Sequence, residues 1–298
     1  MPLMKRQSML RTIFQFKYSM VYPAVLLLLL VIMVPLGYSL YISFHKYILQ
    51  FGLGKWIYLE NYLDAFTDRE FLISTKNTFV LTFSVVSLEF LIALGLALIL
   101  NRDDIAGKKF YTIVLMIPVM MPPIVVGLIW RLLLHPDLGI VNYLMGFIGL
   151  GKLGWYGAPN LAMLTVIGVD VWHETSLIMI ILLAGLTSLD RTPYEAALVD
   201  GASMLQTFFY ITLPMLSPVI MVAVLVRMIA AIKTYDLIYI LTRGGPGFRT
   251  ETMSYYVYKM AFRKMSMGDA AAQSFILLLI ILIFSLVLIK AMETKDVT

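Results

Sequence analysis

The chain has 298 residues, of which 60% are hydrophobic and only 14% are charged. Soluble domains are about 45 to 50% apolar and about 25% charged, so this composition excludes an ordinary soluble domain and indicates a polytopic membrane protein. The formal net charge of +5 fits loops attracted to anionic lipid headgroups better than nucleic-acid binding, and the lack of cysteine excludes disulfides and thiolate metal sites.

Six apolar runs along the chain are long enough to cross a membrane. A hydrocarbon core about 30 Å thick takes about 20 helical residues, so we predict an all-α polytopic fold with six transmembrane helices. The membrane domain covers residues 21–290, between a cytoplasmic N-terminal segment (1–20) and a cytoplasmic tail (291–298). The expected helices are 21–44, 77–100, 110–134, 161–187, 212–240 and 270–290.

The first run follows four basic side chains, Lys5, Arg6, Arg11 and Lys17. It lacks a small-x-small cleavage site and is as long as a full span, so we interpret it as a retained helix rather than a signal peptide. The basic residues before it predict a cytoplasmic N-terminus. With six spans, the C-terminus and the loop at 190–214 are then cytoplasmic as well.

The second and third runs contain residues that are unusual in a membrane helix. Glu89 is the only charge in the second run, and we interpret it as a hydrogen-bonding residue that helps helices to pack. Pro118, Pro122 and Pro123 in the third run predict a kink, whose freed carbonyl groups must face protein or a cavity.

The loop after the fourth run reads "TPYEAALVDGASMLQTFFYITLP" and predicts a cytoplasmic helix over 192–210. Thr192 and Glu195 have the spacing of a capping box, and Pro193 suits the first helical position. Gly201 permits a bend. Between 192 and 214 the only charges are Glu195 and Asp200, both acidic. Helices that lie in the headgroup layer usually carry basic residues, so a protein partner is favoured over the alternative of a lipid-bound amphipathic helix.

Ionisable and aromatic residues inside the later runs are candidates for a substrate pathway, because charge within a membrane is costly. Trp172, Asp236 and Gln273 are the main candidates for a cavity that recognises a sugar through aromatic faces and polar groups. The alternative is that Lys233 with Asp236, or Arg227 with Glu174, form structural ion pairs. The full candidate set is Asp170, Trp172, Glu174, Arg227, Tyr235, Asp236, Gln273 and Ser274.

The segment "EAALVDGASMLQTFFYITLP" resembles the EAA loop of bacterial ABC importer permeases, of the carbohydrate branch. The resemblance covers residues 20–290 and is strongest over 171–274, which includes "KTYDLIYILTRGGPGFRTETMSYYVYKMAF". One departure is Asp190, where such permeases commonly have proline; we expect little consequence. The positions that fill the pattern are Glu195, Ala196, Ala197, Gly201, Ile211, Leu213 and Pro214.

This resemblance implies a type I importer in the cytoplasmic membrane of a bacterium or archaeon. Its expected partners are a second, different permease, two ATPase subunits, an extracytoplasmic solute-binding protein and a sugar. The coupling helix would sit in a groove of the ATPase. The residues expected to couple are Glu195, Ala196, Ala197, Asp200, Gly201, Ala202 and Leu205.

The external segment "TRGGPGFRTET" is expected to dock the binding protein; the alternative is a plain connection with an interfacial aromatic belt. The docking residues would be Gly244, Gly245, Pro246, Arg249 and Glu251.

No catalytic or metal site is expected in the chain. "GFIGLGKL" has the glycine spacing of a P-loop, but Leu153 stands where a hydroxyl must bind Mg²⁺, so ATP and Mg²⁺ are expected on the partner ATPase alone. Three other readings stay open: a permease for a non-sugar solute such as glycerol phosphate, an ion-coupled secondary transporter and a membrane-embedded enzyme.

Overall fold

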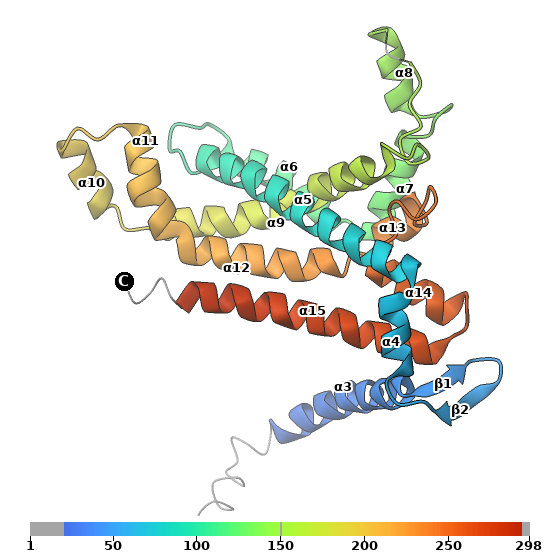
Figure 1. Ribbon diagram of the computed structural model, residues 1–298. Coiled ribbons are helices and arrows are strands. Elements are labelled where there is room, and N and C mark those ends of the chain that lie inside the picture. The colour runs from blue at the N-terminus through green and yellow to red at the C-terminus, as the bar shows by residue number, and fades with distance from the viewer. Residues whose placement is uncertain (1–20, 150, 294–298) are drawn as a thin grey trace, which may run out of the picture. The chain divides into compact units, whose positions relative to one another are not determined.

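The computed structural model describes residues 21–149 and 151–293, which form two compact units (Figure 1). The first unit consists of residues 21–64 and 260–275, and the second of 65–259 and 276–293. The expected N-terminal segment (1–20) lies outside the described residues, as do residues 294–298 of the expected tail.

The first unit joins a membrane-length helix to a small hairpin. Helix α3 (Tyr22–Ser43) leads into strands β1 (His45–Ile48) and β2 (Gly52–Trp56), which pair antiparallel with His45 opposite Trp56. Asn61, in α4 (Glu60–Thr67), fixes this corner by donating to the carbonyl oxygens of Ser43 at 2.8 Å and His45 at 3.0 Å.

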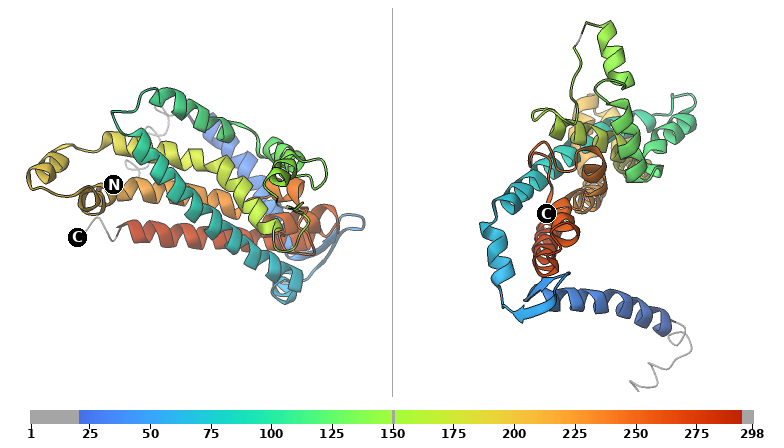
Figure 2. Two further views of the ribbon diagram at one scale, coloured as in Figure 1. Left: turned by 90° about the horizontal axis from the view of Figure 1, so that it is seen from above. Right: turned by 90° about the vertical axis from the view of Figure 1, so that its right-hand side faces the viewer.

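The second unit is a helical bundle, in which α5 packs against α9 and α12, and α9 packs against α12 and α6 (Figure 2). Leu81, Val85, Val166 and Ile232 are buried at its centre. The main helices are α5 (Arg69–Leu100), α6 (Lys108–Met120), α7 (Pro123–Leu133), α9 (Ala162–Ser188), α12 (Leu213–Ile232) and α15 (Met267–Glu293).

Two sets of connections lie at opposite ends of this bundle (Figures 1 and 2). One end carries α10 (Thr192–Val199) and α11 (Met204–Thr207), and the last turns of α15 end there too. The other end carries α7, α8 (Ile140–Phe147), α13 (Asp236–Leu241) and α14 (Met253–Phe262). This separation is the one expected of a membrane protein, in which the connections at one end of the bundle face one side of the membrane and those at the other end face the opposite side.

Among the residues described, five helices are long and apolar enough to span a membrane, and a sixth span is reached if α6 and α7 count as one. The expected first and fourth spans are confirmed to within one residue by α3 and α9. The second span begins earlier than expected, at Arg69, because Asp68 caps it by accepting from the amides of Glu70 at 2.7 Å and Phe71 at 3.4 Å.

The third span bends at its prolines as predicted, but the bend divides it into two helices rather than kinking one. Helices α6 and α7 meet at an angle of 95°. Met121 and Pro122 are both in extended conformation between them, since a proline disfavours the helical conformation of the residue before it.

The fifth span also ends earlier than expected. Helix α12 stops at Ile232, and a separate short helix, α13, starts at Asp236. The three residues between them are Lys233, Thr234 and Tyr235. Their side chains are polar, so they interrupt the apolar run. Both broken spans therefore place irregular backbone next to Arg227 and the other charged residues around it.

Candidate functional site: a buried ion cluster and two loops

Three helices of the bundle meet at one buried arginine. Arg227 of α12 donates from Nε and Nη2 to the two carboxylate oxygens of Glu89 on α5, at 2.6 and 2.8 Å. Its Nη2 also donates to Oδ1 of Asp170 on α9, at 2.7 Å. All three side chains are buried. A two-pronged guanidinium contact of this kind aligns its partners as well as neutralising them.

The ion pairs differ from those expected. Glu89 is not a solitary hydrogen-bonding residue, because it is the main partner of Arg227. Glu174 pairs with His173 at 3.1 Å instead of with Arg227. Within the described part of the chain, Lys233 and Asp236 form no ion pair, because Lys233 follows the end of α12 while Asp236 begins a separate helix.

A cavity of about 200 Å³ lies beside this cluster. It brings together five of the expected pathway residues, from α9, α12 and the start of α13. Pro123 of the broken third span and His173 also contribute to its wall. The expected residues in the lining are Asp170, Glu174, Arg227, Tyr235 and Asp236.

The remaining three pathway candidates are not part of the cavity lining. Trp172 does not line the cavity, which corrects the expectation: its ring meets that of Trp130 edge-on at 5.4 Å. On a helix, residues 170 and 174 share a face, and residue 172 points about 160 degrees away from that of 170. Gln273 and Ser274 belong to the first unit, and Ser274 donates to the carbonyl oxygen of Ala270 at 2.8 Å.

The loop at 190–214 begins with a cap that the sequence pattern assigned to the wrong residue. Thr192 is the first residue of α10 rather than its cap, so the expected capping box with Glu195 is wrong. Asp190 takes that part: its Oδ1 accepts from the amide of Thr192 at 3.0 Å and from its hydroxyl at 2.9 Å. These contacts, led by the backbone hydrogen bond, hold the pKa of Asp190 below its usual value. The departure at Asp190 thus has a structural role.

The expected single helix over 192–210 is divided in two. It breaks at Gly201, which has a φ of +74°, a conformation that only glycine adopts without strain. A true capping box then starts α11: Ser203 Oγ accepts from the amide of Gln206, whose side chain accepts from the amide of Ser203. A short π-helical turn (Phe208–Thr212) connects α11 to α12.

Large apolar side chains are exposed on both halves of this loop. Leu198, Val199, Met204 and Leu205 are 70 to 87% exposed, and we call these four residues the loop patch. A cavity of about 770 Å³ opens beside three of them. Residues 198, 199 and 204 were not among the expected coupling residues, although apolar side chains in a loop that should face water are themselves a signal.

Most of the expected coupling residues remain accessible at this loop. Glu195, Ala196, Asp200, Gly201 and Leu205 are exposed, and Ala202 is half-buried. Ala197 is 7% exposed, and its carbonyl oxygen accepts from the amide of Ala202 at 2.9 Å. It therefore packs the turn and cannot contact a partner, which corrects that expectation.

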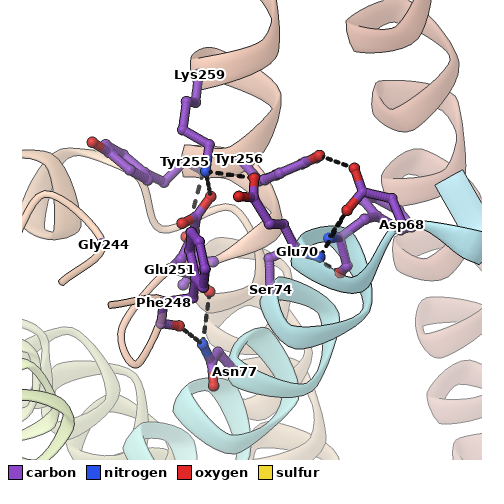
Figure 3. A network of polar contacts seen from close by, with 12 residues as sticks. Asp68, Glu70, Ser74, Asn77, Gly244, Phe248, Glu251, Tyr255, Tyr256 and Lys259 are labelled. Atoms are coloured by element: carbon purple, nitrogen blue, oxygen red, sulfur yellow. Dashed lines mark hydrogen bonds and ion pairs between the residues drawn. The ribbon is translucent and has the colours of Figure 1, made fainter. Parts of the chain in front are cut away.

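At the other end of the bundle, α5 anchors the loop at 242–252 (Figure 3). The side-chain amide of Asn77 donates to the carbonyl oxygens of Phe248 at 2.7 Å and Glu251 at 3.0 Å. Lys259 of α14 bridges the carboxylates of Glu251 at 2.6 Å and Glu70 at 3.1 Å (Figure 3). Burial lowers the pKa of Lys259, but the two carboxylates outweigh it and leave that pKa above its ordinary value.

This anchoring changes the set of residues that can dock a partner. Glu251 is 2% exposed and Gly244 is also buried, so neither can form the expected docking contact. Arg249 is exposed, as are two residues that were not expected, Arg243 and Phe248. Gly245 and Pro246 are half-buried.

Comparison with known proteins identifies the family to which the chain belongs. The family described as "Binding-protein-dependent transport system inner membrane component" matches residues 89–293. A trehalose/maltose transport system permease protein, MalF, of Thermococcus litoralis is 35% identical over 276 residues, which cover 92% of each chain. A sulfoquinovosyl glycerol transport system permease protein, SmoG, of Agrobacterium fabrum is 34% identical over 275 residues, covering 92% of this chain and 89% of that protein.

The fold is shared with a solved structure. A chain of a bacterial ABC transporter involved in the import of the acidic polysaccharide alginate superimposes with a TM-score of 0.81, at 21% identity, over 96% of this chain and 98% of that one. This chain therefore belongs to the family of binding-protein-dependent transport system inner membrane components, and its fold is that of a type I ABC importer permease.

Proposed function

We propose that this chain is a permease subunit of an ATP-driven importer for a sugar or sugar derivative. In this proposal, ATP and Mg²⁺ bind to separate ATPase subunits. The single observation that carries this proposal is the loop patch: four large apolar side chains exposed at the end of the bundle where α10 and α11 lie. Exposed apolar side chains rimmed by polar ones mark a protein contact.

The partners follow from the same features. The loop carries Glu195 and Asp200 beside the patch, so the complementary groove is apolar at its centre and basic at its rim. The names of similar permeases, one for trehalose and maltose and one for sulfoquinovosyl glycerol, support a sugar-type substrate. The family description supports delivery of that substrate by an extracytoplasmic binding protein. The exposed residues Arg243, Phe248 and Arg249 are the proposed docking contacts for that protein.

A second permease completes the substrate path. Ligand pockets are commonly about 300 to 1,000 Å³, whereas the cavity in this chain is about 200 Å³. We therefore propose that this chain supplies one wall of the path and a different permease supplies the other, with both termini and α10 in the cytoplasm.

The test changes the patch without touching the cavity. Replacing both Leu198 and Leu205 by aspartate puts two charges at the centre of the proposed contact, which costs at least about 2 kcal/mol of binding if either is a hot spot. The variant importer should lose its ATPase subunits on purification and lose ATP-driven sugar uptake in proteoliposomes.

Leu144→Asp provides the matched control. Leu144 is 56% exposed on α8, at the opposite end of the bundle, so this change should leave the ATPase subunits bound. Equal ATPase retention by the double variant and the control would contradict the proposed contact. Uptake driven by an imposed ion gradient without ATP would instead identify a secondary transporter.

A further inference from the structure

The cavity beside Arg227 contains an acceptor that no protein group satisfies. Asp170 is 4% exposed and lines the cavity. Its Oδ1 accepts from Arg227, but its Oδ2 is buried and accepts no hydrogen bond from any described residue. Buried polar atoms in native proteins nearly always have a partner, so an unsatisfied carboxylate oxygen at a cavity wall indicates a donor that arrives from outside the chain.

The charges around the cavity favour one class of donor. Glu89, Asp170, Glu174 and Asp236 supply four carboxylates, against the two cations Arg227 and Lys233. With His173 neutral the cluster has a formal charge of −2, and with His173 protonated it has −1. Lys233 lines the cavity and has no ion pair among the described residues. Its charge is already included in this count, so the cluster remains negative.

Resting on the function proposed above, we infer that this cavity selects neutral, hydroxylated solutes and rejects anionic ones, with Asp170 Oδ2 accepting a hydrogen bond from a solute hydroxyl. Arg227 keeps the carboxylate of Asp170 oriented by holding its other oxygen at 2.7 Å. Asp170 is thus a specificity-determining residue for transport, and Arg227 and Glu89 are positioning residues that act through it.

The size of the cavity makes the rejection strong. A space of about 200 Å³ is about 7 Å across, so a charged group inside it lies within about 7 Å of Asp170. A net excess of one negative charge around the cavity, acting at about 7 Å in a medium with an effective permittivity of about 20, repels a singly charged anion enough to weaken its binding about fiftyfold. A neutral sugar of the same size is not subject to this penalty and gains the hydrogen bond.

Asp170→Asn replaces one carboxylate oxygen by an NH₂ group, and so tests both the rejection of anionic solutes and the hydrogen bond to neutral ones. The asparagine oxygen must face the Arg227 guanidinium, because its NH₂ group cannot accept from a donor. The NH₂ group then points toward the cavity, so the site loses its negative charge and presents a donor where it presented an acceptor. Anionic solutes should be admitted, and neutral solutes should bind less tightly.

The measurement uses the complete detergent-purified importer, with its second permease and ATPase subunits but without the binding protein. Saturation-transfer NMR reports weak binding of trehalose and maltose, and of trehalose 6-phosphate and maltose 1-phosphate. The native importer should bind at least one neutral sugar tenfold or more tightly than its phosphate. In Asp170→Asn this preference should fall below about threefold.

Two further variants keep the test decisive if Asp170→Asn assembles poorly. Glu174→Gln removes a lining carboxylate that does not contact Arg227, and should also reduce the preference; Lys233→Met removes a cation and should increase it. A native importer that binds sugar and phosphate equally, or a preference unchanged in Asp170→Asn and Glu174→Gln, overturns the inference and leaves the proposed function standing. Binding of neither sugar, together with failure of ATP-driven sugar uptake, overturns both.

Discussion

At the scale of single residues, the guanidinium of Arg227 joins three helices that are distant in sequence. Its contacts reach Glu89 and Asp170, which lie 138 and 57 residues away in the chain. Replacing a complete buried ion pair with apolar residues can be neutral, but removing one partner leaves buried charge without compensation. The cluster is therefore sensitive to single substitutions.

We predict that Arg227→Met destabilises the protein by about 3 to 5 kcal/mol, because Glu89 and Asp170 lose their shared partner. The matched control is Lys233→Met, at an exposed position without an ion pair among the described residues, where the change should stay within about 0.5 kcal/mol. Tryptophan fluorescence during thermal unfolding of the purified importer measures both. Similar unfolding midpoints for the two variants would show that the cluster is not needed for stability.

A second prediction concerns Lys259, which bridges Glu70 and Glu251 at the loop 242–252 (Figure 3). Lys259→Met leaves the buried Glu251 carboxylate without its cation, which costs about 1 to 3 kcal/mol. Amide hydrogen exchange over residues 242–252 should become faster, whereas Arg263→Met, at an exposed position nearby in sequence, should not change it.

The pH dependence of the Lys259 contact has a definite sign. The pKa of Lys259 in the folded protein is above its ordinary value of 10.5, so the contact stabilises the fold fully below that value. It is lost only as the pH rises through the higher folded pKa. The difference in exchange between native protein and Lys259→Met should therefore persist across pH 6 to 9; a difference that vanished within this range would argue against the ion pair.

At the scale of elements, the loop at 190–214 is two short helices joined at Gly201 rather than one stiff helix. Its φ of +74° allows the chain to turn, and a Cβ atom there would meet no other atom within 4 Å. Substitutions at this position thus act through backbone conformation and charge rather than through steric clashes within the chain.

We predict that Gly201→Ala weakens ATPase retention, because an L-residue with a side chain in this conformation costs about 1 to 2 kcal/mol. Gly201→Asn should be better tolerated, since asparagine adopts left-handed conformations more readily. Gly201→Asp has the same shape as asparagine but adds a charge beside Asp200, and should both lose the ATPase subunits and abolish uptake. Size-exclusion chromatography of the importer provides the readout, and wild-type stoichiometry in Gly201→Asp would contradict the coupling role of this loop.

At the scale of the whole molecule, the family and fold imply a multi-pass membrane protein whose loops face two aqueous compartments. Within the second unit, the loop at 190–214 and the loop at 242–252 lie at opposite ends of one bundle (Figures 1 and 2). A membrane around that bundle separates them, so they must differ in accessibility.

The absence of cysteine makes this orientation directly measurable. We predict that Val199→Cys, at a position 87% exposed, reacts with an impermeant thiol reagent only after cells are opened. Val199 suits this better than Ser203, whose side chain caps α11. Arg249→Cys, on the external loop, should react in intact cells, and the reverse pattern would invert the proposed topology.

The sequence alone determined the class of the protein, the number and approximate position of the membrane-length helices, and the loop whose motif resembles the family. These features are local: a run of about 20 apolar residues must become a helix wherever lipid surrounds it, because no water satisfies its backbone. The same locality explains why Thr192 was mistaken for the cap that Asp190 supplies, since several neighbouring residues had suitable side chains.

Tertiary structure decided which polar groups meet. The rotation and crossing of packed helices turn Glu89 toward Arg227 and leave Glu174 to His173, and no periodicity within one helix encodes these pairings. Burial of Glu251 likewise depends on Lys259 and on the side-chain amide of Asn77, 174 residues away, which donates to the carbonyl oxygen of Glu251. A charged side chain in a membrane domain must be neutralised by whatever packing brings near it, so its partner is a property of the fold rather than of its own segment.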